Sequence, residues 1–188
     1  MNAPVFTRTD PALGEFALRP VDPTADAPVL HSWVTHPKAV FWLMQDCDLA
    51  GVEKEFTRID ADPHHDALLG LHDGAPAFLM ERYDPAHRDL VGIHAARPGD
   101  VGMHFLTAPT DAPVHGFTHA VITTVMESLF ADPDVRRVVV EPDIRNTAVH
   151  AVNKAVGFEV VRTVSLPSKD AYLSTCTREQ FLATRGDR

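Results

Sequence analysis

The stretch VVVEPDIRNTAVHAVNKAVGFE, residues 138–159, decides the fold. It opens with three valines, Val138 to Val140, a short apolar run typical of a strand that is covered on both faces. Asn146 to Val156 then follows a helical pattern and is stopped by Gly157, a favoured residue just past a helix end. A further strand is expected from Glu159 to Ser165. The succession of strand, helix and strand predicts a mixed α/β protein.

The residues before this stretch extend the pattern. A strand is expected at Gly102 to Leu106, and an amphipathic helix from about Gly116 to Phe130. The helix joins two strands, so we expect the strand at 102–106 to lie parallel to the strand at 137–141. The sheet therefore has a central parallel pair.

The N-terminal half adds strands and two helices. Residues 1–14 show no periodicity and are expected to form a flexible N-terminal segment, followed by a single domain at residues 15–183. The expected elements are a strand at Phe16–Val21, a helix from Thr24 or Asp26 to about Thr35, a helix at Leu49–Ile59, strands at Ala67–Leu71 and Ala77–Tyr83 around the turn His72–Pro76, and a last strand at Ala171–Cys176.

Length and composition narrow the class of protein. The 188 residues suffice for one domain with a substantial core. The formal net charge is −9 and Lys and Arg form no cluster, which argues against a nucleic-acid partner. Cys47 and Cys176 are the only cysteines, so no disulfide framework is indicated. Without an apolar leader or a membrane-length apolar stretch, we expect a cytoplasmic protein and no membrane partner.

The order of these elements resembles the GNAT acyltransferase superfamily over nearly the whole chain. Val138-Val139-Val140-Glu141-Pro142-Asp143, Asn146 and Val156-Gly157-Phe158-Glu159 carry the resemblance. The resemblance implies the GNAT fold, with a central mixed β-sheet of about seven strands flanked by about four helices.

A more specific combination of motifs is similar to the siderophore branch of this family, whose members acylate N-hydroxylysine or N-hydroxycadaverine. The motifs are His36-Pro37 before Phe41-Trp42, Gly102-Met103-His104-Phe105-Leu106, Glu141-Pro142-Asp143-Ile144-Arg145-Asn146 and Cys176-Thr177-Arg178-Glu179-Gln180-Phe181. Pro113–Phe117 resembles the cadaverine-type enzymes of desferrioxamine pathways. The resemblance implies an acyl-CoA-dependent enzyme that uses acetyl-CoA or succinyl-CoA and a small hydroxylamine. Monomer and homodimer both stay open.

Binding of CoA requires backbone donors aimed at a pyrophosphate, and the start of a helix after a flexible turn provides them. Thr107 to Thr118 fits this role, although the same residues also suit a plain loop and cap. The expected cofactor contacts are Phe105, Leu106, Thr107, Val114, His115, Gly116, Phe117, Thr118, Asn146 and Asn153. Two departures from the family stand out. Val114 and Thr118 occupy positions where glycines often stand, and Asn153 replaces the tyrosine usually found near the thioester sulfur.

His104 and Asp143 are the expected catalytic residues. Acylation of a hydroxylamine needs a group that takes up a proton, and a histidine titrates in the useful range. A hydrogen-bonded core histidine is the alternative for His104. Asp143 follows the buried strand and is expected to orient His104 or hold the hydroxylamine oxygen. Its alternative is to cap the helix that begins near Asn146.

The acceptor is expected to bind at Phe41, Trp42 and Met44, because an aromatic wall suits a five-carbon chain. His115 and His119 are spaced as a metal pair, but no third ligand stands near them, so no metal site is expected. His64 and His65 are expected in a surface loop. Two other functions stay open at this point: a GNAT enzyme for another amine or a protein amino group, and a non-catalytic acyl-CoA-binding module.

Overall fold

The computed structural model describes residues 2–186. Its strands are β1 (Phe6–Asp10), β2 (Gly14–Pro20), β3 (His65–His72), β4 (Ala75–Tyr83), β5 (Asp100–Thr107), β6 (Arg137–Val140), β7 (Glu159–Ser165) and β8 (Asp170–Thr177). Its helices are α1 (Ala27–Val34), α2 (Leu49–Asp60), α3 (Phe117–Ala131), α4 (Thr147–Ala155) and α5 (Arg178–Ala183), with a 3-10 helix η1 at Pro37–Trp42. The mixed α/β class is confirmed, with one more strand and one more α-helix than expected.

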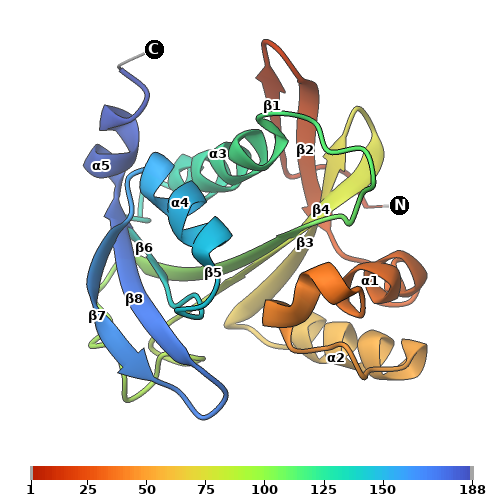
Figure 1. Cartoon of the computed structure of the whole chain (residues 1–188), viewed down its shortest axis with the longest axis horizontal. Helices are drawn as coiled ribbons and strands as arrows, with labels where there is room; N and C mark the ends of the chain where they lie inside the picture. Colours follow the sequence, from red (N-terminus) through yellow and green to blue (C-terminus); the bar gives the residue numbers. More distant parts are fainter. Residues whose placement is uncertain (1, 187–188) are drawn as a thin grey trace. The chain divides into compact units, whose positions relative to one another are not determined.

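The strands bond in the order β1-β2-β3-β4-β5-β6-β8-β7 (Figure 1). β5 and β6 are parallel, with Asp100 opposite Arg137 and Gly102 opposite Val139. This pair is connected through α3, so the predicted crossover is confirmed. Strands in parallel register end at the same edge of the sheet, which brings residues at the carboxyl ends of β5 and β6 to one place.

Contacts divide the chain into two units. The N-terminal unit comprises Met1–Arg82 and Phe105–Thr124, and the C-terminal unit comprises Tyr83–His104 and Val125–Arg188. Each unit has its own core. The single domain expected at residues 15–183 stays a prediction.

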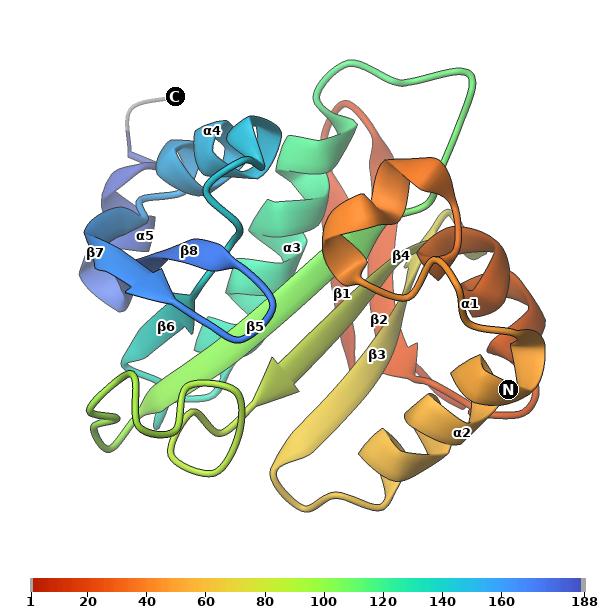
Figure 2. The same ribbon diagram turned by 60° about the horizontal axis from the view of Figure 1, so that its bottom comes forward.

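Helices α1 and α2 lie side by side in the N-terminal unit and cover β3 (Figure 2). Each helix buries one apolar face, because its apolar residues recur at helical spacing. Asp48 caps α2 by accepting a hydrogen bond from the amide of Gly51. The core of this unit consists of Val21, Leu30, Trp33, Val34, Val52, Phe56, Ile59, Leu69 and Leu79.

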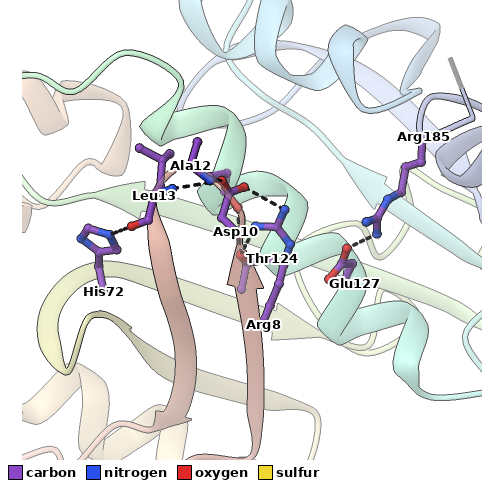
Figure 3. Close-up of polar contacts among 9 residues, drawn as sticks. Arg8, Asp10, Ala12, Leu13, His72, Thr124, Glu127 and Arg185 are labelled. Atoms are coloured by element: carbon purple, nitrogen blue, oxygen red, sulfur yellow. Dashed lines mark hydrogen bonds and ion pairs between the residues drawn. The ribbon is translucent and has the colours of Figure 1, made fainter. Parts of the chain in front are cut away.

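Residues 6–10, expected within a flexible segment, form strand β1 instead. This strand pairs with β2 from Phe6 opposite Leu18 to Asp10 opposite Gly14. Figure 3 shows how its side chains are held: Arg8 donates to Thr124 of α3 at 3.4 Å and to Asp10 at 3.0 Å. The segment escaped prediction because an edge strand with polar side chains has little apolar alternation.

The predicted hairpin of β3 and β4 is confirmed. Asp73 and Gly74 make the turn with φ of 47° and 80°, the pair of positive angles that a two-residue hairpin turn requires. His65, expected in a surface loop, begins β3 and is buried against Glu81, with Nε2 of His65 at 3.2 Å from the carboxylate.

The C-terminal unit packs β6, β8 and β7 around a second core of Tyr83, Leu90, Val139, Val164, Ala171 and Leu173. Helix α5 was not predicted. It begins with a capping box in which Thr177 and Gln180 bond each other's backbone amides. Arg185, just after α5, pairs with Glu127 of α3 (Figure 3). No helix within residues 2–186 is long and apolar enough to cross a membrane.

Candidate active site

His104 lies on β5 of the C-terminal unit and contacts a buried carboxylate. Its Nε2 donates to Oε1 of Glu141 at 2.8 Å. Glu141 directly follows β6, and its side chain is only 3% exposed, whereas that of His104 is 30% exposed. The register of the parallel strands explains why these two side chains come together. Gly102 lies opposite Val139, so His104 and Glu141, each two residues further along the chain, also lie opposite one another.

Glu141 has two further partners. The hydroxyl of Tyr83 donates to Oε2 at 2.8 Å, and Nζ of Lys169 lies 3.5 Å from Oε1. Burial by itself would raise the pKa of this carboxyl, but the charges and hydrogen bonds of His104, Lys169 and Tyr83 outweigh it and lower the pKa to about 2. Glu141 is therefore ionised at neutral pH, although it is enclosed by protein.

The hydrogen bond fixes the tautomer of His104. An ionised carboxylate can only accept, so Nε2 of the imidazole carries the proton. In the neutral ring the lone pair then lies on Nδ1. A half-exposed imidazole in this state can accept a proton at Nδ1, which is the chemistry of a general base.

The ring of Tyr83 flanks that of His104, with 5.2 Å between the ring centroids. Gly102 makes room for it, because a Cβ at this position would lie 2.2 Å from two carbons of the Tyr83 ring. Gly102 and His104 are two residues apart and so face the same side of β5. The spacing of glycine and histidine in the Gly102-Met103-His104 sequence thus has a steric reason.

Asp143 follows β6, as expected from the sequence, and its carboxylate is bonded to Arg145. Its Oδ1 accepts from the backbone amide of Arg145 at 2.8 Å, and its Oδ2 pairs with the Arg145 guanidinium at 2.6 Å. These bonds to Arg145 lower the pKa of Asp143 to about 2. Among the described residues the carboxylate on Nε2 of His104 is that of Glu141, whereas Asp143 bridges to Ala171 and bonds Arg145 in the turn that follows. Asp143 does not cap α4 either, because Asn146 does so through Val149.

Comparison with known proteins agrees with the observed fold. The model of the acetyltransferase (GNAT) domain matches residues 22–166. The chain belongs to the GNAT acetyltransferase family. The fold agrees: a computed superposition on an uncharacterized protein from Bacillus halodurans gives a TM-score of 0.90 at 27% identity, covering 98% of this chain and 95% of that one.

Curated GNAT relatives include proteins named for N-acylation. The chain is 32% identical to "Lysine N-acyltransferase MbtK" of Mycobacterium sp. (strain MCS) over 78% of its own length and 61% of the relative's. It is 27% identical to an N-hydroxyputrescine acetyltransferase of Acinetobacter baumannii, covering 88% and 79%. It is 30% identical to "Hydroxyornithine transacylase SID3" of Ajellomyces capsulatus, covering 96% and 42%. The chain thus spans only part of the first and third relatives.

Asn153, expected at the position of the usual GNAT tyrosine, is buried in α4 at 5% exposure. Its amide oxygen, Oδ1, has no hydrogen-bond partner among the described residues. A buried polar group without a partner costs stability, so it commonly marks a function or a bound molecule. Asn146, the other expected cofactor contact of this unit, uses its side chain for the cap of α4.

The other expected cofactor residues lie in the N-terminal unit. Phe105, Leu106 and Thr107 end β5, and Val114 to Gly116 form an exposed turn before α3, whose first residues are Phe117 and Thr118. Gly116 has a φ of 81°, which a side chain would strain, while the space around its Cα is open. Lys38 of η1 fastens the loop by donating to the carbonyl of Thr110 at 2.6 Å.

The expected acceptor residues share a surface of this unit with one cofactor residue. Trp42, Met44 and Leu106 all pack against the apolar core of the N-terminal unit. Phe41 precedes Trp42 in η1 and is half-buried. A wall of this kind can bind an aliphatic chain, but the packing of Trp42 also stabilises the core.

Sequence reasoning missed Glu141, Tyr83 and Lys169. Glu141 stands two residues before Asp143 in the same motif, and only the parallel register distinguishes the two carboxylates. Tyr83 ends β4 and Lys169 lies in the turn before β8, so both are far from His104 in sequence. No local pattern identifies such partners.

Proposed function

We propose that this chain transfers an acyl group from acyl-CoA to the nitrogen of a hydroxylamine, giving a hydroxamate for a siderophore. The preferred acceptor is N-hydroxycadaverine, with N6-hydroxylysine as the alternative, and the donor is acetyl-CoA or succinyl-CoA. The hydrogen bond of His104 to buried Glu141 carries the proposal, because it orients the imidazole so that the neutral ring has its lone pair on Nδ1. Relatives named for N-hydroxyputrescine and hydroxyornithine support the choice of acceptor.

In the proposed reaction the nitrogen of the hydroxylamine attacks the thioester carbonyl. A carbon–nitrogen bond forms, the carbon–sulfur bond breaks, and the nitrogen loses its proton to Nδ1 of His104. That proton then passes to the sulfur of the departing CoA. A hydroxylamine is mostly neutral at pH 7, so a base of modest strength suffices.

Each unit contributes proposed contacts of its own. In the N-terminal unit the backbone amides at Gly116 to Thr118 suit the pyrophosphate of CoA, since the start of α3 is the positive end of the helix dipole. Phe41, Trp42 and Met44 suit the aliphatic chain of the acceptor. In the C-terminal unit Asn153 suits the thioester region, where its Nδ2 can donate a hydrogen bond but no proton and its unpaired Oδ1 can only accept one.

The compartment is also a proposal. Cys47 and Cys176 are both free, and burial raises the pKa of the Cys176 thiol to about 12, so this thiol is not reactive. Free cysteines fit the reducing cytoplasm.

A panel of acceptors tests the function. Thiol release from acetyl-CoA and succinyl-CoA is measured with N-hydroxycadaverine, N6-hydroxylysine, N-hydroxyputrescine and cadaverine. We expect kcat/KM for N-hydroxycadaverine to exceed that for cadaverine by about 100-fold, or ~2.7 kcal/mol of barrier, because the site has no strong acid or base for an ammonium.

Other outcomes reassign the protein. Equal rates with N-hydroxycadaverine and cadaverine would overturn the hydroxamate assignment. A preference for N6-hydroxylysine would move the enzyme to the lysine-derived branch. Tight binding of acyl-CoA in calorimetry, without turnover of any acceptor, would make the chain a binding module.

A further inference from the structure

We infer that Tyr83, Gly102, Glu141 and Lys169 form a positioning shell, here called the His104 cradle, that fixes the orientation of the His104 imidazole and directs its Nε2 proton to Glu141. The inference rests on the proposed function in one respect, namely that His104 is the base. The existence of the cradle is independent of the acceptor. It can therefore be tested without turnover.

Glu141 is the centre of the cradle. Its carboxylate lies in a position that is 3% exposed and receives His104 on Oε1 and Tyr83 on Oε2, both at 2.8 Å. A buried carboxylate held through both oxygens cannot rotate without breaking one of these bonds. The direction of its Oε1 therefore sets the plane and tautomer of the imidazole, as carboxylates do for histidines at many sites.

Tyr83 and Gly102 hold the ring from the side. The Tyr83 side chain is buried, and its ring fills the space that the missing Cβ of Gly102 leaves. From there it lies against the His104 ring at a tilt of 42°. His104 is partly exposed, so a hydrogen bond at Nε2 by itself would leave the ring free to swing about that bond. The contact with Tyr83 restricts that rotation.

Lys169 offsets the negative charge of Glu141. Its Nζ lies near Oε1 of Glu141, the same oxygen that accepts from His104. Lys169 is placed there because its turn closes with paired bonds between Leu166 and Lys169, while the next residue, Asp170, accepts from the amide of Ile144 at 3.0 Å. A carboxylate alone would favour the charged imidazolium. Lys169 opposes this effect of the carboxylate.

The remaining charged groups beside the cradle leave this balance in place. Asp143 and Arg145 pair with each other at 2.6 Å next to Lys169, and together they carry no net charge.

The test is a measurement of the imidazole tautomer by NMR of the full chain labelled with 15N at histidine. In the wild type we expect neutral His104 to carry its proton on Nε2. In Glu141→Gln we expect a mixture of tautomers, because a glutamine has one acceptor oxygen where the carboxylate has two. His94, whose Nε2 bonds Asp100 at 2.9 Å, serves as the reference that does not change.

Titration of the same NMR signals with pH distinguishes a positioning role of the cradle residues from a purely structural role. We expect the pKa of His104 to fall in Glu141→Gln and to rise in Lys169→Met, in opposite directions, while Tyr83→Phe keeps the ring contact and changes the pKa least. Turnover of Glu141→Gln should fall about 10- to 100-fold, with the acid limb of its pH profile displaced to lower pH. Tyr83→Phe and Lys169→Met keep the inference testable if Glu141→Gln fails to fold.

Two results would overturn the cradle: a wild-type His104 protonated on Nδ1, or a pKa of His104 that is the same in all three variants. Failure of the proposed function is a different result. It would appear as no hydroxamate product in the acceptor panel, with the tautomer and the pKa changes still as expected.

Discussion

Two histidine–carboxylate pairs of the C-terminal unit have a buried carboxylate and differ in what surrounds them. His104 bonds Glu141 at 2.8 Å, and His94 bonds Asp100 at 2.9 Å. Both carboxylates are 3% exposed, but His94 is 11% exposed and His104 30%. Asp100 is also bound through both oxygens by Arg137, whereas Glu141 has only a tyrosine hydroxyl and a more distant lysine.

The positions of the two pairs on the sheet explain the difference. Asp100 and Arg137 are the first residues of β5 and β6, so they lie at the amino ends of the parallel pair. His104 and Glu141 lie toward and beyond the carboxyl ends, where open α/β sheets bind ligands. A histidine–carboxylate pair alone therefore indicates little. Its end of the sheet and the exposure of the imidazole separate a structural pair from a candidate catalytic one.

Removal of each histidine tests this contrast most directly. We expect His104→Ala to lower turnover by about 100-fold or more, because a general base is lost, with the affinity for acyl-CoA nearly unchanged. His94→Ala should keep turnover within about threefold and lower the free energy of unfolding by ~1 kcal/mol, since Asp100 keeps Arg137. Steady-state kinetics, calorimetric titration of CoA and urea unfolding measure these changes. Unchanged turnover in His104→Ala would assign His104 to the core.

Acid titration compares the two carboxylates. The pKa of Glu141 is about 2 in the folded chain, whereas an unperturbed glutamate has a pKa of 4.5. The ionisation of Glu141 therefore stabilises the fold above pH 4.5, and this stabilisation is lost as the pH falls toward 2. Between pH 5 and 3 this amounts to ~2 kcal/mol. Urea unfolding at several pH values should show a shallower acid loss for Glu141→Gln than for the wild type.

Asp100→Asn is the control for this titration. Burial opposes the ionisation of Asp100, but its bonds to Arg137 and His94 lower its pKa, so we expect the same sign. If the acid loss of Glu141→Gln equals that of the wild type, Glu141 is not the ionised centre described above.

The sequence predicted the scaffold better than the site. Elements with strong periodicity, such as α2 and α3, were placed to within a few residues, because local burial patterns determine them. β1 was missed, since its polar edge pattern resembles a tail, and α5 was missed although Thr177 and Gln180 spell a capping box. These errors concern single elements and leave the architecture intact.

There is a physical reason why the sequence points to only some of the candidate site residues. His104 was selected as a candidate because a histidine in a strand is a local feature. Its carboxylate partner depends on the register of two strands that are 37 residues apart along the chain at the contact. Asp143 was expected to serve His104 because it follows the buried strand, whereas in the structure Glu141 bonds His104 and Asp143 bonds Arg145. Catalytic roles for both His104 and Asp143 stay predictions.

The ion pair of Asp143 is only partly enclosed by protein, because the side chain of its partner Arg145 is 72% exposed. Asp143→Asn preserves the shape and the bond from the backbone of Arg145 but removes the charge. We expect turnover to fall about tenfold with the melting temperature nearly unchanged, if the carboxylate holds the hydroxylamine oxygen. Kinetics and thermal unfolding of the same preparation measure both. A loss of thermal stability alone would show that Asp143 serves only the turn.

The smallest effects are expected for the two asparagines of the α4 segment. They again contrast a structural side chain with a candidate functional one. Asn146 uses its side chain to cap the helix, whereas Oδ1 of Asn153 is buried without a partner among residues 2–186. Asn146→Ala should therefore lower the free energy of unfolding by ~1 kcal/mol. Asn153→Leu should raise it by ~1 kcal/mol, because a branched apolar side chain replaces a buried amide that lacks a hydrogen bond.

The same Asn153→Leu variant should bind acyl-CoA several-fold more weakly, since the amide is then lost to the ligand. A rise in stability together with a loss of affinity is the signature of a polar group kept for function at a cost to the fold. Urea unfolding without ligand and calorimetric titration with acetyl-CoA measure the two quantities separately. A variant that loses stability and keeps its affinity would place Asn153 beside Asn146 as a structural residue, and the leaving sulfur would then need a different donor.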